Sequence, residues 1–240
     1  MTFREVQIGP CRLINADCME VLPGLSGVDA VVTDPPYGVE FHGKNTKHTK
    51  KSSDGYIGGD CGDIGPRAVK WCVDAGWRCV VTPGAAIAFE YPKPAEMGGV
   101  FCPSGAGLGR WGFIGTHPIL YYGKCPYLAN GMGHRPNSFQ SFATSPPNGH
   151  PCPKPVEWME WLVAKASAFE SETILDPFMG SGTTGIACIR TDRKFIGIER
   201  EPKYFDLACD RIQRGWDLKC SELPFDPPSQ FVQKTFLEAV

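Results

Sequence analysis

The residues of this sequence best suited to chemistry are Asp34, Pro35, Pro36 and Tyr37, which follow an apolar run at residues 30–32. An ionised carboxylate accepts hydrogen bonds without donating any, and proline has no backbone N–H, so this stretch presents acceptors. The prolines also hold φ at about −65°, which makes the arrangement stiff. Two fixed acceptors beside an aromatic ring could hold an N–H group of a planar molecule.

A second stretch, residues 174–187, runs from an apolar segment through glycines into a helical pattern. Gly180, Gly182 and Gly185 satisfy the spacing G-x-G-x-x-G, and Glu199 stands seventeen residues after Gly182. In a nucleotide-binding βαβ unit, an acid near that position reaches the ribose hydroxyls. The stretch therefore predicts a site for a nucleotide-like cofactor.

Asp176 separates two cofactors that could use this loop. A nicotinamide dinucleotide places a pyrophosphate at the helix N-terminus, where a carboxylate at the end of the preceding strand would repel it. S-adenosylmethionine instead carries an ammonium and a sulfonium, which the carboxylate attracts. Asp176 thus favours S-adenosylmethionine. A plain strand-ending turn at Asp176-Pro177 is the structural alternative.

The elements around these stretches follow from hydrophobic periodicity and from the positions of glycine and proline. Helices are predicted at 67–75, 155–169, 183–190 and 202–214, and a helical turn ends at Pro23-Gly24. Strands are predicted at 12–15, 28–33, 78–82, 173–175 and 194–198. Asp34 then lies at the carboxyl end of a central parallel strand, the edge where ligands bind in open α/β sheets. Residues 84–153, rich in glycine and proline, receive no firm elements.

Composition limits the fold and the setting of the protein. The 240 residues suffice for one α/β domain, and the net charge of −2 neither demands nor forbids a polyanionic partner. The eleven cysteines contain no C-x-x-C pair, which favours reduced thiols in a cytoplasmic protein. We expect no metal, although a zinc site from Cys61, Cys72 and Cys79, or from His150 and Cys152, is an alternative. No signal peptide or membrane span is expected.

A group of lysines marks the polar segment after Tyr37. The functional interpretation is contact with phosphates, and the alternative is a solvated loop. The group consists of Lys44, Lys47, Lys50 and Lys51.

Three stretches together resemble the DNA amino-methyltransferases, which methylate N6 of adenine or N4 of cytosine: 34–37 (DPPY), 176–182 (DPFMGSG) and 195–199 (FIGIE). The tetrapeptide precedes the glycine loop, which resembles the permuted, β-type order of that family. The resemblance covers residues 12–37 and 150–214. It implies a Rossmann-like α/β methyltransferase fold with a mostly parallel sheet, one antiparallel strand and circularly permuted motif order. A single domain is expected, with a catalytic half at 12–82, target-recognition elements within 84–149 and a cofactor half at 150–214.

The resemblance implies a catalytic role for 34–37. The Asp34 carboxylate and the Pro35 carbonyl would each accept one N–H of the target amine, so that its lone pair faces the methyl group, while Tyr37 would stack on a base flipped out of duplex DNA. Asp17 would meet the cofactor adenine, with a plain turn aspartate as the alternative. Lys154 would meet the methionine carboxylate, and Arg135 the DNA. The residues assigned to S-adenosylmethionine are Asp17, Lys154, Asp176, Phe178, Gly180, Ser181, Gly182, Thr183 and Glu199.

Asp34 favours the N6 amine of adenine in DNA as the target. The same fold acting on N4 of cytosine, on RNA or on a glutamine amide is an alternative, as is an inert DNA-binding relic. A nicotinamide oxidoreductase would leave 34–37 without a role. Whether the protein is a monomer or a homodimer stays open.

Overall fold

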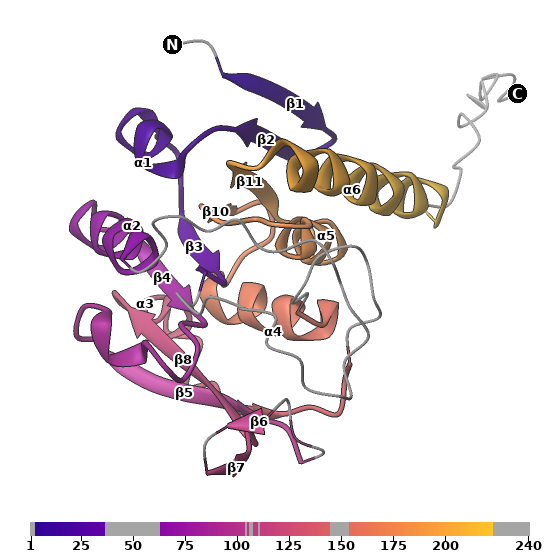
Figure 1. Cartoon of the computed structure of the whole chain (residues 1–240). Helices are drawn as coiled ribbons and strands as arrows, with labels where there is room; N and C mark the ends of the chain where they lie inside the picture. Colours follow the sequence, from indigo (N-terminus) through magenta and orange to yellow (C-terminus); the bar gives the residue numbers. More distant parts are fainter. Residues whose placement is uncertain are drawn as a thin grey trace, which may run out of the picture.

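The computed structural model describes residues 3–36, 63–103, 105, 108–109, 111–144 and 154–222. Within them, helices and strands alternate along most of the chain (Figure 1). The helical segments are α1 (Cys18–Val21), η1 (Leu22–Gly24), α2 (Ile64–Asp74), η2 (Ala88–Glu90), α3 (Pro126–Ala129), α4 (Val156–Ala166), α5 (Thr183–Arg190) and α6 (Pro202–Glu222). The strands are β1 (Arg4–Ile8), β2 (Cys11–Asn15), β3 (Ala30–Thr33), β4 (Arg78–Val81), β5 (Glu96–Phe101), β6 (Leu108–Gly109), β7 (Gly112–Phe113), β8 (Thr116–Tyr122), β9 (Phe139–Gln140), β10 (Thr173–Asp176) and β11 (Lys194–Glu199).

Nine of the described strands form one mixed sheet in the order β1-β2-β11-β10-β3-β4-β8-β5-β9, and β6 pairs with β7 separately. The five strands from β2 to β4 in this order are mutually parallel. This confirms the predicted α/β fold with a mostly parallel sheet. Two described strands, β1 and β8, run against the parallel set, where the sequence suggested one.

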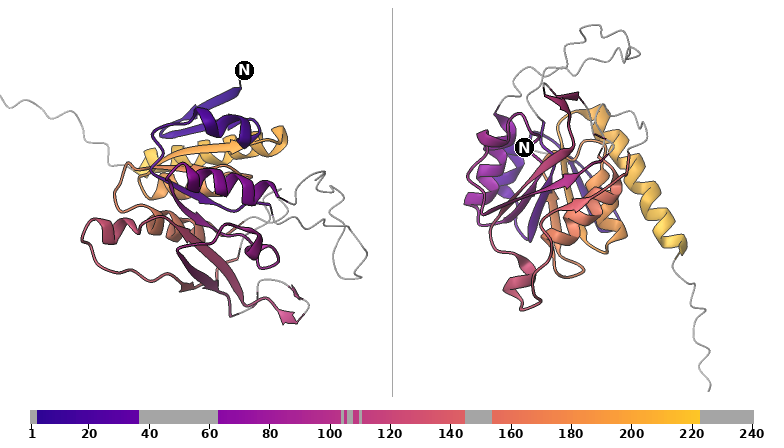
Figure 2. Two further views of the ribbon diagram at one scale, coloured as in Figure 1. Left: turned by 90° about the vertical axis from the view of Figure 1, so that its left-hand side faces the viewer. Right: turned by 90° about the horizontal axis from the view of Figure 1, so that it is seen from below.

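Helices cover both faces of the sheet, as the views in Figure 2 show. One face packs on α4, α5 and α6, and the other packs on α1 and α2. The inner strands are apolar on both faces, as the buried run of β3 illustrates, because both faces are covered. The predicted strands and helices of the two ends of the chain are confirmed, and α6 continues to Glu222, beyond the predicted end at 214.

The middle of the chain is more regular than its sequence suggests. The segment 84–149, for which no firm elements were predicted, contributes β5, β8 and β9 to the main sheet. Strand β5 contains Gly98 and Gly99, residues that weaken a strand pattern. A Cβ on Gly98 would collide with the backbone oxygen of Asn137, so a glycine is needed for the close approach of that segment. Tertiary packing therefore overrides the local pattern here.

A switch in connection direction lies between β10 and β3, which are neighbours in the sheet. From β3 the chain continues through α2 to β4 on one side, while from β10 it continues through α5 to β11 on the other. Helices α2 and α5 lie on opposite faces of the sheet. In open α/β sheets the crevice at such a point, beyond the carboxyl ends of the strands, is the ligand site.

Candidate active site

Polar side chains stand at the carboxyl ends of four neighbouring strands. Glu199 ends β11, Asp176 ends β10, Asp34 follows β3 and Thr82 follows β4. Because these strands are adjacent and parallel, the four side chains form one row along the same edge of the sheet. The row crosses the switch point between β10 and β3. The structure therefore brings the two predicted halves of the site together.

Asp34 is a half-buried acid of this row. Its Oδ1 accepts a hydrogen bond of 2.6 Å from the Thr82 hydroxyl, and its Oδ2 forms an ion pair of 2.7 Å with Lys154 Nζ. The side chains of Lys154 and Asp34 are 10% and 22% exposed. The sequence assigned Lys154 to a cofactor carboxylate, whereas here its ammonium lies on Asp34. Pro35 is buried, Pro36 is half-buried, and Tyr37 lies outside the described residues.

Two aromatic residues line the same region from the α4 side. The rings of His117 and Trp158 meet edge to face with centroids 5.1 Å apart. Burial, with the nearby Lys154 ammonium, lowers the pKa of His117, so its imidazole is neutral at neutral pH. The indole Nε1 of Trp158 is buried and, within the described part of the chain, has no hydrogen-bond partner.

Asp176 is 2% exposed, and both of its carboxylate oxygens accept hydrogen bonds from the protein. Its Oδ1 accepts hydrogen bonds from the Thr33 hydroxyl at 2.7 Å and the Phe178 N–H at 3.0 Å, and its Oδ2 accepts one from the Thr184 hydroxyl at 2.6 Å. Burial raises the pKa of Asp176 to about 6, against the opposing effect of these donors. In this conformation the carboxylate organises the turn between β10 and α5.

The glycine turn is held by its own backbone amides. The Gly180 N–H donates to Glu199 Oε2 at 3.0 Å, and the Gly182 N–H donates to the Met179 carbonyl at 2.8 Å. Glu199 Oε1 also accepts from the Glu201 N–H at 2.8 Å. Gly182 adopts φ +79°, a left-handed conformation that suits glycine. Glu199 thus holds the backbone of the turn by a hydrogen bond, and its carboxylate oxygens retain further lone pairs.

Ser181 and Thr183 face helix α6. Arg211 of α6 donates from Nη1 to the Ser181 carbonyl, to the Ser181 hydroxyl at 2.7 Å and to the Thr183 hydroxyl at 3.4 Å. Both side chains are buried. They anchor the glycine turn on α6, a role different from the direct cofactor contact that the sequence suggested.

Asp17 lies beside the other end of the row. It is the N-cap of α1, and its Oδ1 accepts from the Met19 N–H at 2.8 Å. The Ala16 N–H donates to the Glu199 carbonyl at 3.2 Å, which ties the turn after β2 to the end of β11. Phe178 is half-buried against the side chains of the α1 and α2 face. Asp17, Phe178 and Glu199 therefore lie at one end of the row.

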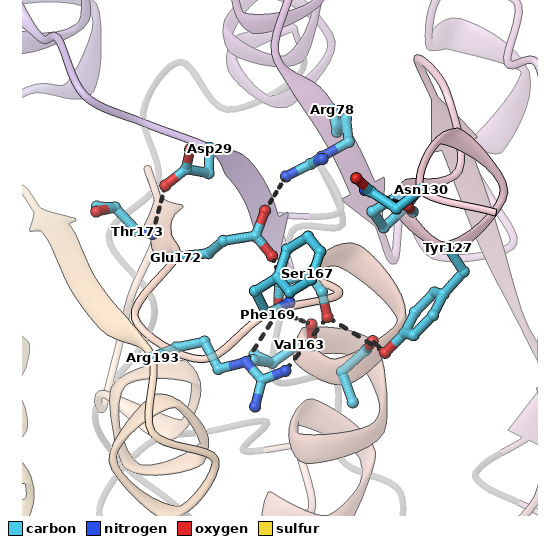
Figure 3. Close-up of polar contacts among 12 residues, drawn as sticks. Asp29, Arg78, Tyr127, Asn130, Val163, Ser167, Phe169, Glu172, Thr173 and Arg193 are labelled. Carbon is cyan, nitrogen blue, oxygen red and sulfur yellow. Dashed lines mark hydrogen bonds and ion pairs between the residues drawn. The ribbon is translucent and has the colours of Figure 1, made fainter. Parts of the chain in front are cut away.

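Arg135 lies away from this site. Its guanidinium Cζ stands 4.0 Å from the ring centroid of Tyr127 in α3, and its carbonyl accepts from Lys165 at 2.9 Å. Helix α3 follows β8, whose antiparallel direction takes the chain to the edge where the parallel strands begin. Figure 3 shows Tyr127 at that edge with Arg193 and Ser167. The structure therefore does not bring Arg135 to Asp34.

The predicted DNA contacts Lys44, Lys47, Lys50 and Lys51 lie outside the described residues.

Sequence reasoning missed the hydroxyls that hold the acids, and it missed Arg211, His117 and Trp158. One signal was available, because Val-Val-Thr directly precedes both Asp34 and Pro83. A threonine at the end of a buried strand indicates a hydrogen-bond partner there.

No cluster of three potential metal ligands occurs among the described residues, where Cys72 and Cys79 are buried free thiols. Cys61, His150 and Cys152 lie outside those residues. None of the described helices is both long and apolar enough for a membrane span.

The sequence matches the model of a known protein family over part of its length. A family model described as DNA methylase, N6_N4_Mtase, matches residues 110–210, which include α4, β10, α5 and β11. This match covers less than half of the 240 residues of the chain. The order of Asp34 before the glycine turn is consistent with the permuted type of this family.

Similar methylases share short stretches with the chain. The type II methyltransferase M2.LlaDCHI of Lactococcus lactis subsp. cremoris is 47% identical over 66 residues, 28% of this chain and 24% of that protein. M2.DpnII of Streptococcus pneumoniae is 45% identical over 64 residues, 27% of this chain and 24% of that protein. The matched stretches thus span about a quarter of these curated relatives.

Solved methylase structures resemble the whole fold. The M1.HpyAVI–SAM complex aligns with a TM-score of 0.56 at 21% identity, over 84% of this chain and 98% of the other. The PvuII DNA methyltransferase, described as cytosine-N4-specific, aligns with a TM-score of 0.58 at 16% identity, over 92% of this chain and 97% of the other. At these identities the likeness confirms the fold.

Proposed function

We propose that this protein transfers a methyl group from S-adenosylmethionine to the exocyclic N6 amine of adenine in DNA. The observation that carries the proposal is the position of Asp34 at the switch point, one strand away from the glycine turn that follows β10. A cofactor at the carboxyl end of β10 and a base at the carboxyl end of β3 would then be neighbours.

The side chains present fit S-adenosylmethionine. Carboxylates of Asp17, Glu199 and Asp34 line the edge, which suits a cofactor with ribose hydroxyls and positive charges and disfavours a pyrophosphate. The amides of Gly180 and Gly182 are bonded to Glu199 and Met179, so they are not offered to a phosphate. We assign Glu199 to the ribose hydroxyls of S-adenosylmethionine, and Asp17 and Phe178 to its adenine. Gly180 is assigned to the place where the backbone of the protein comes close to the cofactor.

When bound, S-adenosylmethionine supplies an electrophilic methyl group on a sulfonium. The Asp34 carboxylate accepts one N–H of the target amine and the Pro35 carbonyl accepts the other, which directs the nitrogen lone pair toward the cofactor side. Thr82 and Lys154 hold Asp34 in place. The stiff prolines keep both acceptors oriented, so positioning supplies most of the rate enhancement. Tyr37 stacks on the flipped base.

DNA is the proposed partner, and Lys44, Lys47, Lys50 and Lys51 are the proposed phosphate contacts. The Asp-Pro-Pro-Tyr stretch favours adenine, whereas the PvuII neighbour is described as cytosine-N4-specific, so N4 of cytosine is the second candidate. A cytoplasmic location is also proposed, since the described cysteines are free thiols.

The deciding experiment combines labelled methyl transfer to DNA with mass spectrometry of the nucleosides. We expect N6-methyladenine. N4-methylcytosine would move the proposal to the second candidate, and label found only in RNA or protein would refute it. A thermal-shift assay gives an independent check, because S-adenosylhomocysteine should stabilise the protein and NADH should not. Stabilisation by NADH alone would favour an oxidoreductase.

A further inference from the structure

Tyr91 carries a buried hydroxyl with no hydrogen-bond partner among the described residues. The residue is 6% exposed, so water does not substitute freely for a protein partner. A buried polar group without a partner costs stability, and an exception of this kind in a folded protein calls for an explanation. The position of the hydroxyl near Pro35 supplies this explanation.

The hydroxyl lies against the catalytic turn. A Cβ on Gly65, in the first turn of α2, would stand 2.6 Å from Tyr91 Oη and 2.9 Å from the Pro35 Cβ. Tyr91 Oη and the Pro35 ring therefore border the same space, which Gly65 leaves open. Burial, with the charge of Asp34, raises the pKa of Tyr91, so the hydroxyl keeps its proton and remains a donor at neutral pH.

A neighbouring tyrosine shows the ordinary structural use of such a hydroxyl. Tyr122 of β8 is 5% exposed and donates to the Pro92 carbonyl at 2.8 Å, which fixes the chain next to Tyr91. Both tyrosines lie in the apolar cluster on the α1 and α2 face. The two tyrosines thus share burial and surroundings, and only the Tyr122 hydroxyl has a partner among the residues that the structure describes.

We propose that Tyr91 is a positioning residue whose hydroxyl donates a hydrogen bond to an acceptor of the 34–36 turn when the target base occupies the site. This inference rests on the proposed methyl transfer. With no partner among the described residues, the hydroxyl is available for such a bond in the free protein. Base binding adjusts the turn, and the new bond fixes the directions in which Asp34 and Pro35 accept the amine.

The test compares Tyr91→Phe with Tyr122→Phe and the unsubstituted protein. Because the Tyr91 hydroxyl has no partner in the described part of the chain, its removal should leave the thermal midpoint of Tyr91→Phe equal or higher, while removing the bonded hydroxyl of Tyr122 should lower it. For Tyr91→Phe we expect kcat for DNA methylation to fall about tenfold, equal to about 1.4 kcal/mol, with KM for S-adenosylmethionine unchanged. Tyr122→Phe should keep its kcat at a temperature where it is folded.

Each other result has a defined meaning. An unchanged kcat in Tyr91→Phe with an equal or higher midpoint would show that the hydroxyl is unused in the reaction. A lower midpoint would show that it is already bonded in the free protein, and either result overturns the inference. If the unsubstituted protein transfers no methyl group to DNA while binding S-adenosylhomocysteine, the proposed function fails and the inference fails with it.

Discussion

Replacing Asp176 by asparagine should remove a defined pH dependence from the stability of this protein. The carboxyl group lies buried between the hydroxyls of Thr33 and Thr184. Burial raises the pKa of Asp176 from 3.8 to about 6. The folded state therefore binds the proton more tightly than the unfolded chain does. The stability linked to this proton is present below about pH 4 and is lost as the pH rises through about 6.

The size of the effect follows from the pKa difference. A rise from 3.8 to about 6 at about 1.36 kcal/mol per unit gives about 3 kcal/mol over the full range. Between about pH 5 and about pH 7.5, where most unfolded-state carboxyls are already ionised, the loss amounts to about 1.4 kcal/mol. Asparagine stays neutral, so the stability of the variant relative to the unsubstituted protein should rise by about 1.4 kcal/mol across this interval.

Urea unfolding followed by tryptophan fluorescence at several pH values measures this difference. Glu5→Gln is the control, because the hydrogen bond from Arg12 lowers the pKa of Glu5. That carboxyl is ionised in both states above about pH 5, so the control difference should stay flat. A flat difference for Asp176→Asn as well would refute the reasoning, since it would mean that the hydroxyl donors outweigh the burial of the carboxylate.

Three further predictions concern the site. Asp34→Ala should abolish methyl transfer, measured with labelled cofactor, while S-adenosylhomocysteine still binds in calorimetry. Loss of both would show that Asp34 belongs to the cofactor half of the site, contrary to its proposed role. Arg211→Gln should lower the unfolding free energy by about 1–3 kcal/mol, because buried Ser181 loses its charged donor; an unchanged urea midpoint would contradict this. Four glutamine substitutions should weaken DNA binding and lower the slope of log K against log salt by at most about 3.6, at about 0.9 per phosphate contact; an unchanged slope would return the segment to a solvated loop. The substituted residues are Lys44, Lys47, Lys50 and Lys51.

The sequence predicted the parallel half of the sheet because its strands are continuous apolar runs. Residues 28–33 and 194–198 contain the strands β3 and nearly all of β11 at their predicted places. Strand β5 could not be found in the same way, because Gly98 is required by contact with Asn137, thirty-nine residues later in the chain. A local pattern carries no information about such a contact.

The acids of the candidate site could be predicted from the sequence, whereas most of their hydrogen-bond and ion-pair partners could not. Asp34, Asp176 and Glu199 stand at strand ends, which periodicity locates well. The partners of these acids come from distant segments, as Lys154 and Thr82 do for Asp34. Arg135 was placed by its position in the chain, and the reversal of direction in β8 takes its segment to the other edge of the sheet. Direction within a sheet is a property of pairing, which a single sequence does not display.

The glycine turn shows how a shared spacing can serve different cofactors. In a dinucleotide site the amides of such a turn face the pyrophosphate. Here Glu199 accepts from the Gly180 amide, and the acid and the turn form one unit. A pyrophosphate would have to displace Glu199 and then lie beside Asp176 and Asp34. A cofactor that offers hydroxyls to Glu199 needs no such displacement, because each carboxylate oxygen has a second lone pair. The same hydrogen bond that closes the turn thus selects against phosphate and leaves Glu199 available to a ribose.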